Sequence, residues 1–125
     1  PQALALALRN AAEIHLPDLE RSTAGIHFAG MLAKLGLAER LAPALRPHPN
    51  GTTAMAALAA STMPGALGCT QATEIIAQPG TQLVGLLPAD FALSTLYSAA
   101  LCVRASNGSE AEAFIAQLSS KSAKA

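Results

Sequence analysis

The sequence has little aromatic content, little charge and no long apolar run. Tryptophan is absent, there are one tyrosine and three phenylalanines, and charged residues make up 13% of the chain with a formal net charge of zero. A nucleic-acid-binding surface needs clustered basic residues with aromatic side chains among them, so this composition argues against nucleic acid as a partner. No run of about eighteen uncharged apolar residues occurs, so we expect no membrane-spanning helix.

The common catalytic and metal-binding motifs are also missing. There is no Gly-x-Gly-x-x-Gly fingerprint, P-loop, Gly-x-Ser-x-Gly elbow, Cys-x-x-Cys pair or His-x-x-x-His pair. His15, His27 and His48 are scattered along the chain, and we expect no metal and no cofactor. Cys69 and Cys102 are expected to be buried free thiols, and the alternative is a disulfide in an oxidising compartment. Thiol catalysis by Cys69 with a histidine brought near it by folding stays open as an alternative.

The sequence is rich in alanine, and segments with a helix-like pattern alternate with segments that have a strand-like pattern. The apolar fraction is 51%, and alanine favours helices. A chain of 125 residues can bury a core as one domain. We expect helices over residues 2–10, 22–36, 50–61, 71–78 and 109–120, strands over residues 11–18, 64–70, 81–88 and 94–106, and a short helical turn with a brief extended segment over residues 38–49. The last helix is expected to begin with a capping box from Ser109 to Glu112.

This alternation predicts an α/β fold with a largely parallel sheet. Such sheets bind ligands outside the carboxyl ends of their strands, so we searched the strand-to-helix junctions. Three of them, residues 21–25, 49–53 and 69–73, combine hydroxyl side chains with the start of a helix. Helix N-termini bind anions, and equally any ligand rich in hydrogen-bond acceptors. The alternative is that these polar residues only cap the helices.

Individual residues near these junctions have expected roles. In "GCTQATE", residues 68–74, Cys69 is expected on the strand, Thr70 as the helix cap, and Glu74 one turn in, where a carboxylate suits the helix dipole. His27 lies in the first turn of the helix that follows Ser22. It is either a partly exposed helix residue or a hydrogen-bond donor to a ligand.

Four segments together resemble a known family. "STAGIHFAGMLAKLGL", "NGTTAMAALAAS", "GCTQATEIIAQPGTQLVGLLP" and "STLYSAALCVRAS" with "EAEAFIAQLSS" resemble the molybdate-type solute-binding proteins of ABC transporters, which are type II periplasmic binding proteins. The resemblance covers nearly the whole chain and implies a three-layer α/β sandwich lobe. By this resemblance residues 1–92 form the second ligand-binding lobe. Residues 93–125 form the hinge strand and the helix that return to the first lobe, whose opening half is missing, so we expect a fragment or a processed chain.

The resemblance also implies which residues contact the ligand. Ala24 matches the family's backbone donor at the first helix start, and a second donor falls on Thr52 or Thr53. Gln71 falls where the molybdate binders have a tyrosine, and its amide both donates and accepts. An acceptor suits a fully deprotonated oxyanion poorly, so a small organic or partly protonated ligand becomes plausible. The ligand-binding residues implied are Ser22, Thr23, Ala24, Gly25, Thr52, Thr53 and Gln71.

The function implied is that of the solute-binding component of an ABC importer. Such a protein is not an enzyme, is periplasmic and has the transporter's membrane subunits as partners. It would bind a small polar or anionic solute, a molybdate-like oxyanion or a small organic acid, in the cleft between two lobes. The alternative is the ligand-sensing effector domain of a bacterial transcription regulator, which shares this architecture.

A lobe without its partner exposes apolar and strand-edge surface. We therefore expect self-association, through the hinge strand around Tyr97. Tyr97 itself is expected to be a packing residue with its hydroxyl at the hinge.

Overall fold

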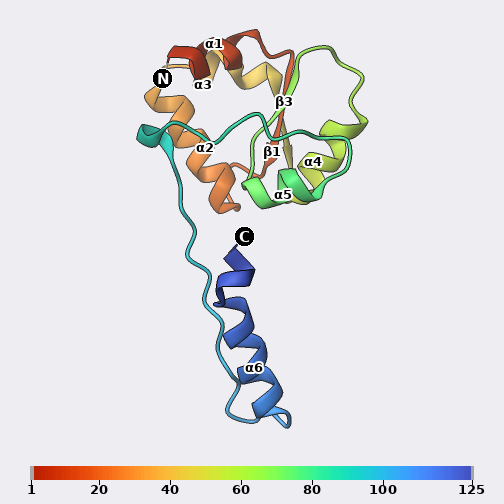
Figure 1. Cartoon of the computed structure of the whole chain (residues 1–125). Helices are drawn as coiled ribbons and strands as arrows, with labels where there is room; N and C mark the ends of the chain where they lie inside the picture. Colours follow the sequence, from red (N-terminus) through yellow and green to blue (C-terminus); the bar gives the residue numbers. More distant parts are fainter. Residues whose placement is uncertain (1, 125) are drawn as a thin grey trace. The chain divides into compact units, whose positions relative to one another are not determined.

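The computed structural model describes residues 2–124 and divides the chain into two units. Unit 1 ends at Leu93 and unit 2 begins at Ser94. The elements of unit 1 are α1 (Gln2–Asn10), β1 (Glu13–Pro17), α2 (Thr23–Lys34), α3 (Ala38–Leu41), η1 (Ala42–Ala44), β2 (Leu45–His48), α4 (Gly51–Ala60), β3 (Ala66–Gly68), α5 (Ala72–Ala77) and η2 (Ala89–Phe91). Up to α5 this order follows the expected one closely (Figure 1).

The sheet of unit 1 has three parallel strands in the order β2-β1-β3. β1 is central, with Ile14 beside Leu45 of β2 and beside Leu67 of β3. On the edge strand β2, Pro47 is exposed and pairs in register with Leu16. An edge strand tolerates proline because the missing N–H can face outward. The α/β class with a parallel sheet is thereby confirmed.

One face of the sheet carries the main hydrophobic core. Ile14 and Leu16 of β1 are fully buried and pack with Phe28 and Met31 of α2. Further core residues come from α1, α2 and α3: Leu8, Leu32, Leu37 and Leu41. At about 25 cal/mol for each Å² of apolar surface buried, each of these large side chains contributes roughly 1.5–3 kcal/mol to folding. The core therefore fixes β1 against the helices of one layer.

Helix α4 covers the other face of the sheet, so unit 1 has three layers. Gly68 of β3 lies beneath this helix, where a Cβ would come within 2.6 Å of Met55 Cε and 2.7 Å of Leu58 Cδ2. Glycine is thus needed at this position for helix and strand to pack. Because side chains alternate along a strand, Glu13 and His15 of β1 also lie on the side of α4.

Helix α2 ends where its sequence predicts. Gly36 has a φ of 65°, a left-handed conformation that glycine adopts without strain. The Leu37 N–H donates to the Leu32 carbonyl at 2.9 Å, as in the usual glycine-ended helix terminus.

Unit 2 contains α6 (Gly108–Leu118) and η3 (Lys121–Lys124). Its extended segment, residues 94–106, forms no strand, although we predicted the longest strand of the chain there. Residues 81–88 of unit 1 form no strand either. Both predictions are wrong for the same reason. An apolar, β-favouring segment becomes a strand only when another strand accepts its backbone hydrogen bonds. In the described residues the sheet has the order β2-β1-β3, and no fourth strand pairs with β3.

Three local predictions in unit 2 are also wrong. The N-cap of α6 is Asn107, so Ser109 lies inside the helix, where its hydroxyl donates to the neighbouring Glu110 at 3.0 Å and forms no capping box with Glu112. Tyr97 is 74% exposed and is not a packing residue. Cys102 is a free thiol but an exposed one.

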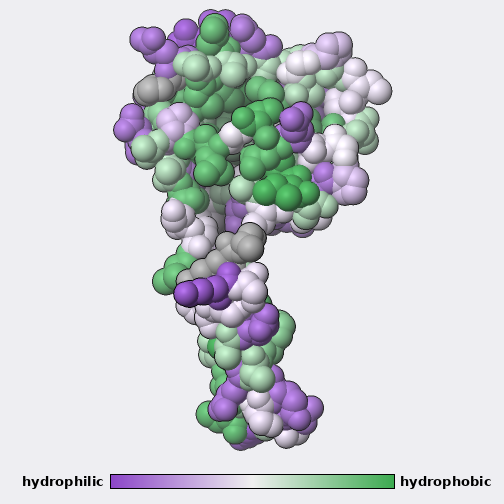
Figure 2. Space-filling view, in the orientation of Figure 1, coloured by the Kyte–Doolittle hydropathy of each residue, from purple (hydrophilic) through white to green (hydrophobic). Residues whose placement is uncertain are grey.

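No helix among residues 2–124 is long and apolar enough to cross a bilayer. Hydrophobic surface nevertheless gathers on one face of unit 1, as Figure 2 shows. Ile76, Val84 and Leu86 are among the large apolar side chains that unit 1 exposes.

Candidate functional site

The three predicted junctions all follow the carboxyl ends of parallel strands. β1 leads to the start of α2, β2 to the start of α4, and β3 to the start of α5. Because the strands run in one direction, these helix starts lie at one edge of the sheet (Figure 1). We call this edge, formed by residues 18–25, 49–53 and 69–74, the polar edge.

At the first junction a tight turn directs the chain from β1 into α2. Asp18 Oδ1 accepts hydrogen bonds from the backbone N–H groups of Glu20 at 2.8 Å and Arg21 at 2.9 Å. These bonds hold the pKa of Asp18 below its ordinary value, because they stabilise the charged carboxylate. The Asp18 carboxylate therefore stabilises this turn.

The start of α2 is packed closely against the end of β1. A Cβ on Gly25 would overlap the carbonyl oxygen of Asp18 and come within 2.6 Å of that of Pro17. The helical hydrogen bonds begin with Ile26 N–H donating to the Ser22 carbonyl at 2.8 Å. Ser22 is the N-cap, as expected, but its side chain makes no capping bond. The N–H groups of the first turn, including that of Ala24, come before this first helical hydrogen bond. They have no acceptor within the helix and can donate to a ligand.

The second junction is capped by Asn50. Its Oδ1 accepts from Thr53 N–H at 2.9 Å and from the Thr53 hydroxyl at 3.0 Å. Both donors of Thr53 are therefore engaged in the cap. Thr52 is exposed and lies one residue earlier in the first turn. Of the two threonines that the sequence suggested, Thr52 is the better placed donor.

The third junction meets the second directly. The Thr70 hydroxyl donates to Glu74 Oε2 at 2.5 Å, and a Cβ on Gly51 would overlap both of these side chains. The N-cap of α5 is Gln71, not Thr70, so the predicted cap was wrong by one residue. Glu74 does lie in the first turn of α5, as predicted.

A small hollow separates α4 from α5 behind this contact. Its volume is about 180 Å³, and it is lined by Thr52, Thr73, Glu74, Ala77 and Gln78. The structure therefore brings Thr52 of the second junction together with the helix that Gln71 begins. Ser22, Thr23, Ala24 and Gly25 belong to the same edge of the sheet but do not line this hollow.

His27 has a role that neither interpretation of the sequence included. Its Nε2–H donates to the Phe91 carbonyl at 2.7 Å, across 64 positions of the chain. Phe91 and Leu87 also pack against the core. His27 thus fastens the segment after α5 to α2, and the sequence could not show this because the acceptor is a backbone atom.

Cys69 is a poor nucleophile. It packs against the core, and burial raises the pKa of its thiol to about 12. A thiol reacts as the thiolate, and at neutral pH only about one Cys69 in 10⁵ would be ionised at that pKa. Cys69 lies one residue after β3, which ends at Gly68, and not on the strand as predicted. Its backbone N–H still donates to the His15 carbonyl at 3.0 Å.

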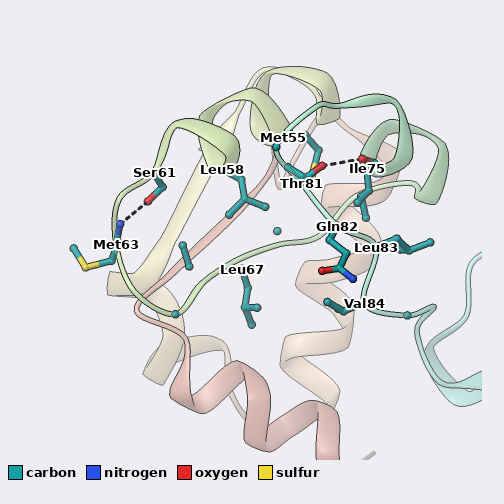
Figure 3. A pocket seen from close by; sticks show the side chains of 15 residues that line it. Met55, Leu58, Ser61, Met63, Leu67, Ile75, Thr81, Gln82, Leu83 and Val84 are labelled. Atoms are coloured by element: carbon teal, nitrogen blue, oxygen red, sulfur yellow. Dashed lines mark hydrogen bonds between the residues drawn. The ribbon is translucent and has the colours of Figure 1, made fainter.

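A larger hollow, which the sequence did not predict, lies along the free edge of β3 (Figure 3). Its volume is about 340 Å³, and polar and apolar atoms contribute almost equally to its walls. The Thr81 hydroxyl in it is bonded to the Ile75 carbonyl at 2.8 Å, and Ser61 Oγ accepts from Met63 N–H at 3.2 Å. These two hydroxyls are already engaged within the protein, and the Gln82 side chain also lines the hollow. None of the predicted ligand-binding residues lines it.

Within residues 2–124, no three His, Cys, Asp or Glu side chains are grouped to hold a metal ion. A three-layer α/β unit with helix starts along one sheet edge and a partly buried, weakly reactive thiol has the character of a binding module. The family follows from the sequence: residues 1–125 match the family described as bacterial extracellular solute-binding protein, so the chain belongs to it. The family is one of binding proteins and not of enzymes, which excludes thiol catalysis by Cys69. No curated protein and no solved structure matches the chain.

Proposed function

We propose that this protein is the periplasmic solute-binding component of an ABC importer, and that the polar edge contacts its solute in the cleft between two lobes. The observation that carries the proposal is the convergence of three helix starts at the carboxyl ends of parallel strands, two of them in direct contact around Gly51. The family supports solute binding and delivery to the transporter's membrane subunits.

The chemistry of the polar edge favours a small solute with one negative charge, or a polar one, over a dianion. The first turns of α2 and α4 supply N–H donors. Gln71 adds an amide that also accepts, and the Glu74 carboxylate lies beside Gly51. A carboxylate next to the second junction repels a doubly charged oxyanion more strongly than a monoanion. A small organic acid or a partly protonated oxyanion therefore fits better than molybdate.

Isothermal titration calorimetry tests the function with a panel of molybdate, sulfate, lactate, succinate and uncharged polyols. We expect binding of at least one singly charged or polar solute. Absence of binding to the entire panel by protein that circular dichroism shows to be folded contradicts the proposal.

A backbone donor can be removed without removing the helix. Proline is tolerated in the first helical turn and lacks an N–H, so Ala24→Pro deletes the proposed donor of α2. A lost hydrogen bond to a charged ligand costs about 1.5–3 kcal/mol, which is roughly ten- to a hundredfold in affinity. Ala24→Ser keeps the N–H and is the matched control. Equal affinities for the two variants would show that α2 does not contact the solute.

A further inference from the structure

A chain of three polar side chains, of which the central one is buried and the outer two are partly exposed, lies on the face of the sheet that α4 covers. His15, which is 7% exposed, lies at its centre. Its Nδ1 is 3.1 Å from His48 Nε2, and its Nε2 is 3.3 Å from Glu13 Oε2. The two imidazole rings are nearly parallel, with centroids 5.3 Å apart. No residue of the polar edge takes part in this chain.

The hydrogen bonds fix where the protons lie. A carboxylate only accepts, so His15 Nε2–H donates to Glu13. In a neutral His15 the Nδ1 atom is then an acceptor, and His48 Nε2–H donates to it. His48 Nδ1 is left as the outer end of the chain. An added proton binds His48 Nδ1 without breaking a hydrogen bond. A second proton would bind His15 Nδ1, and the new N–H would then face the Nε2–H of His48.

Glu13 is held as an anion at the inner end of the chain. Burial raises the pKa of Glu13, but hydrogen bonds from His15, Ser61 and Arg46, with the Arg46 charge, outweigh it, so the pKa lies below its ordinary value. The hydrogen bonds from Arg46 Nε and the Ser61 hydroxyl are 3.2 and 3.3 Å long. Glu13 therefore stays ionised while His48 takes up a proton.

Few other charges face the two histidines. On the same sheet face they are Glu13 and Arg46; residues 51–60 of α4 and 66–68 of β3 carry no ionisable side chain. From α5, Glu74 contacts the first turn of α4 at Gly51. Protonation of His48 would therefore change the net charge on this face of unit 1 substantially.

His48 is the last residue of β2 and stands two residues before Asn50, the cap of α4. Two peptide units span at most about 7.6 Å between Cα atoms, which is within the Debye length of about 8 Å at physiological salt. We propose that the His48–His15–Glu13 chain takes up a single proton through His48, and that the resulting charge strengthens binding of an anionic solute at the adjacent start of α4. This inference rests on the proposed function, because it requires the solute to bind at the polar edge.

The expected effect is modest. Two unit charges about 8 Å apart near a protein surface, screened over one Debye length at physiological salt, change an equilibrium constant by about two- to fivefold. Burial, and then the neighbouring His15, lower the pKa of His48 below its ordinary value, so affinity rises only when the pH falls below about 6.5. By linkage, a bound anion raises the titration midpoint of His48 by the same factor, about 0.3–0.7 pH unit.

The test uses lactate and sulfate, whose charges stay constant between about pH 7.5 and about pH 5 because they ionise at lower pH. Calorimetry measures their affinity for the wild type, for His48→Gln and for the control His27→Gln. In the wild type and in His27→Gln we expect binding at the lower pH to be about two- to fivefold tighter for lactate, and tighter still for the doubly charged sulfate. In His48→Gln we expect no change for either anion. The same rise in all three proteins, or no rise in any, overturns the inference while the proposed function stands.

A second measurement follows the imidazole resonances by NMR in the same pH range. One proton taken up by the His15–His48 pair, with a midpoint that lactate or sulfate raises, supports the inference. Full and independent protonation of both rings overturns it. If neither anion binds at any pH, the proposed anion site is contradicted and the effect on affinity with it, whereas the NMR titration still decides whether the pair takes up one proton.

Discussion

Gly51 at the start of α4 lies against the carboxylate of Glu74 in α5, so closely that a Cβ on the glycine would overlap it. This contact joins the second and third junctions of the polar edge. It requires position 51 to have no side chain and places the acid of one helix beside the N-terminus of another. An anion at a helix N-terminus is stabilising by about 0.3–1 kcal/mol, so the contact contributes to the fold as well as shaping the site.

Gly51→Ala should therefore lower the free energy of unfolding by about 1–3 kcal/mol, the usual cost of overpacking. Urea denaturation followed by circular dichroism measures it. Gly30→Ala is the matched control, because Gly30 is in a helix and has nothing within 4 Å of its Cβ position. There alanine should be neutral or stabilising by up to about 1 kcal/mol. If both variants lose stability equally, the packing described for Gly51 is wrong.

The stability of the protein should fall as the pH drops from about 7.5 to about 5. Burial and the neighbouring His15 lower the pKa of His48 in the folded state. The unfolded chain, in which this pKa is about 6.5, then binds more protons, so acidification favours unfolding. Thermal denaturation of the wild type and of His48→Gln isolates this contribution, because the variant should lose less stability over that range. A variant with the same pH dependence as the wild type would contradict the assignment.

Below about pH 4.5 a second loss of stability should follow. The folded-state pKa of Glu13 is lowered, so its contribution is present above the unfolded-state pKa and is lost as the pH falls through the folded value. Glu13→Gln should flatten this part of the curve of unfolding temperature against pH.

The two cysteines should react with iodoacetamide at very different rates. Cys102 is exposed, and the pKa of Cys69 is raised to about 12 by burial. Because the thiolate is the nucleophile, mass spectrometry of the native protein at pH about 8 should show one modified cysteine, at position 102. Cys69 should become modified after urea is added. Rapid modification of Cys69 in the native protein would show that it is not buried.

Gln71 should determine which anions are preferred. Replacing it by tyrosine removes the amide acceptor and leaves a hydroxyl that can donate. We expect Gln71→Tyr to shift the ratio of molybdate to lactate affinity toward molybdate by about tenfold, which is the value of one hydrogen bond. Calorimetry with both ligands measures the ratio. Gln71→Glu, which adds a charge, should weaken both, and an unchanged ratio in Gln71→Tyr would place Gln71 outside the site.

Unit 2 should promote self-association. Leu96 is 91% exposed and Val103 fully exposed, in an extended segment with no partner strand among the described residues. Light scattering at increasing concentration should show oligomers, and Val103→Lys should reduce them because a charge opposes edge-to-edge pairing. Ala123→Lys, in the short helix η3, is a control for charge alone. A monomer at all concentrations would refute this prediction.

The sequence predicted the first two thirds of the chain well because the signals there are local. Gly36 ends α2, Asn50 caps α4, and the apolar β1 leads into a polar turn. The segments 81–88 and 94–106 failed because a strand depends on a partner that no local pattern encodes. At the polar edge, the junctions could be located, but the roles of Gly51 and His27 depend on Glu74 and the Phe91 carbonyl, which are distant in sequence.

Pro47 has a consequence for how the sheet can grow. It lies in the edge strand β2, exposed and without an N–H, so a strand of another molecule that approached this edge would meet a missing donor. Proline at such an edge acts as a gatekeeper against polymerisation. The opposite edge, at β3, has no such protection, and any ordered aggregate of this sheet should begin there.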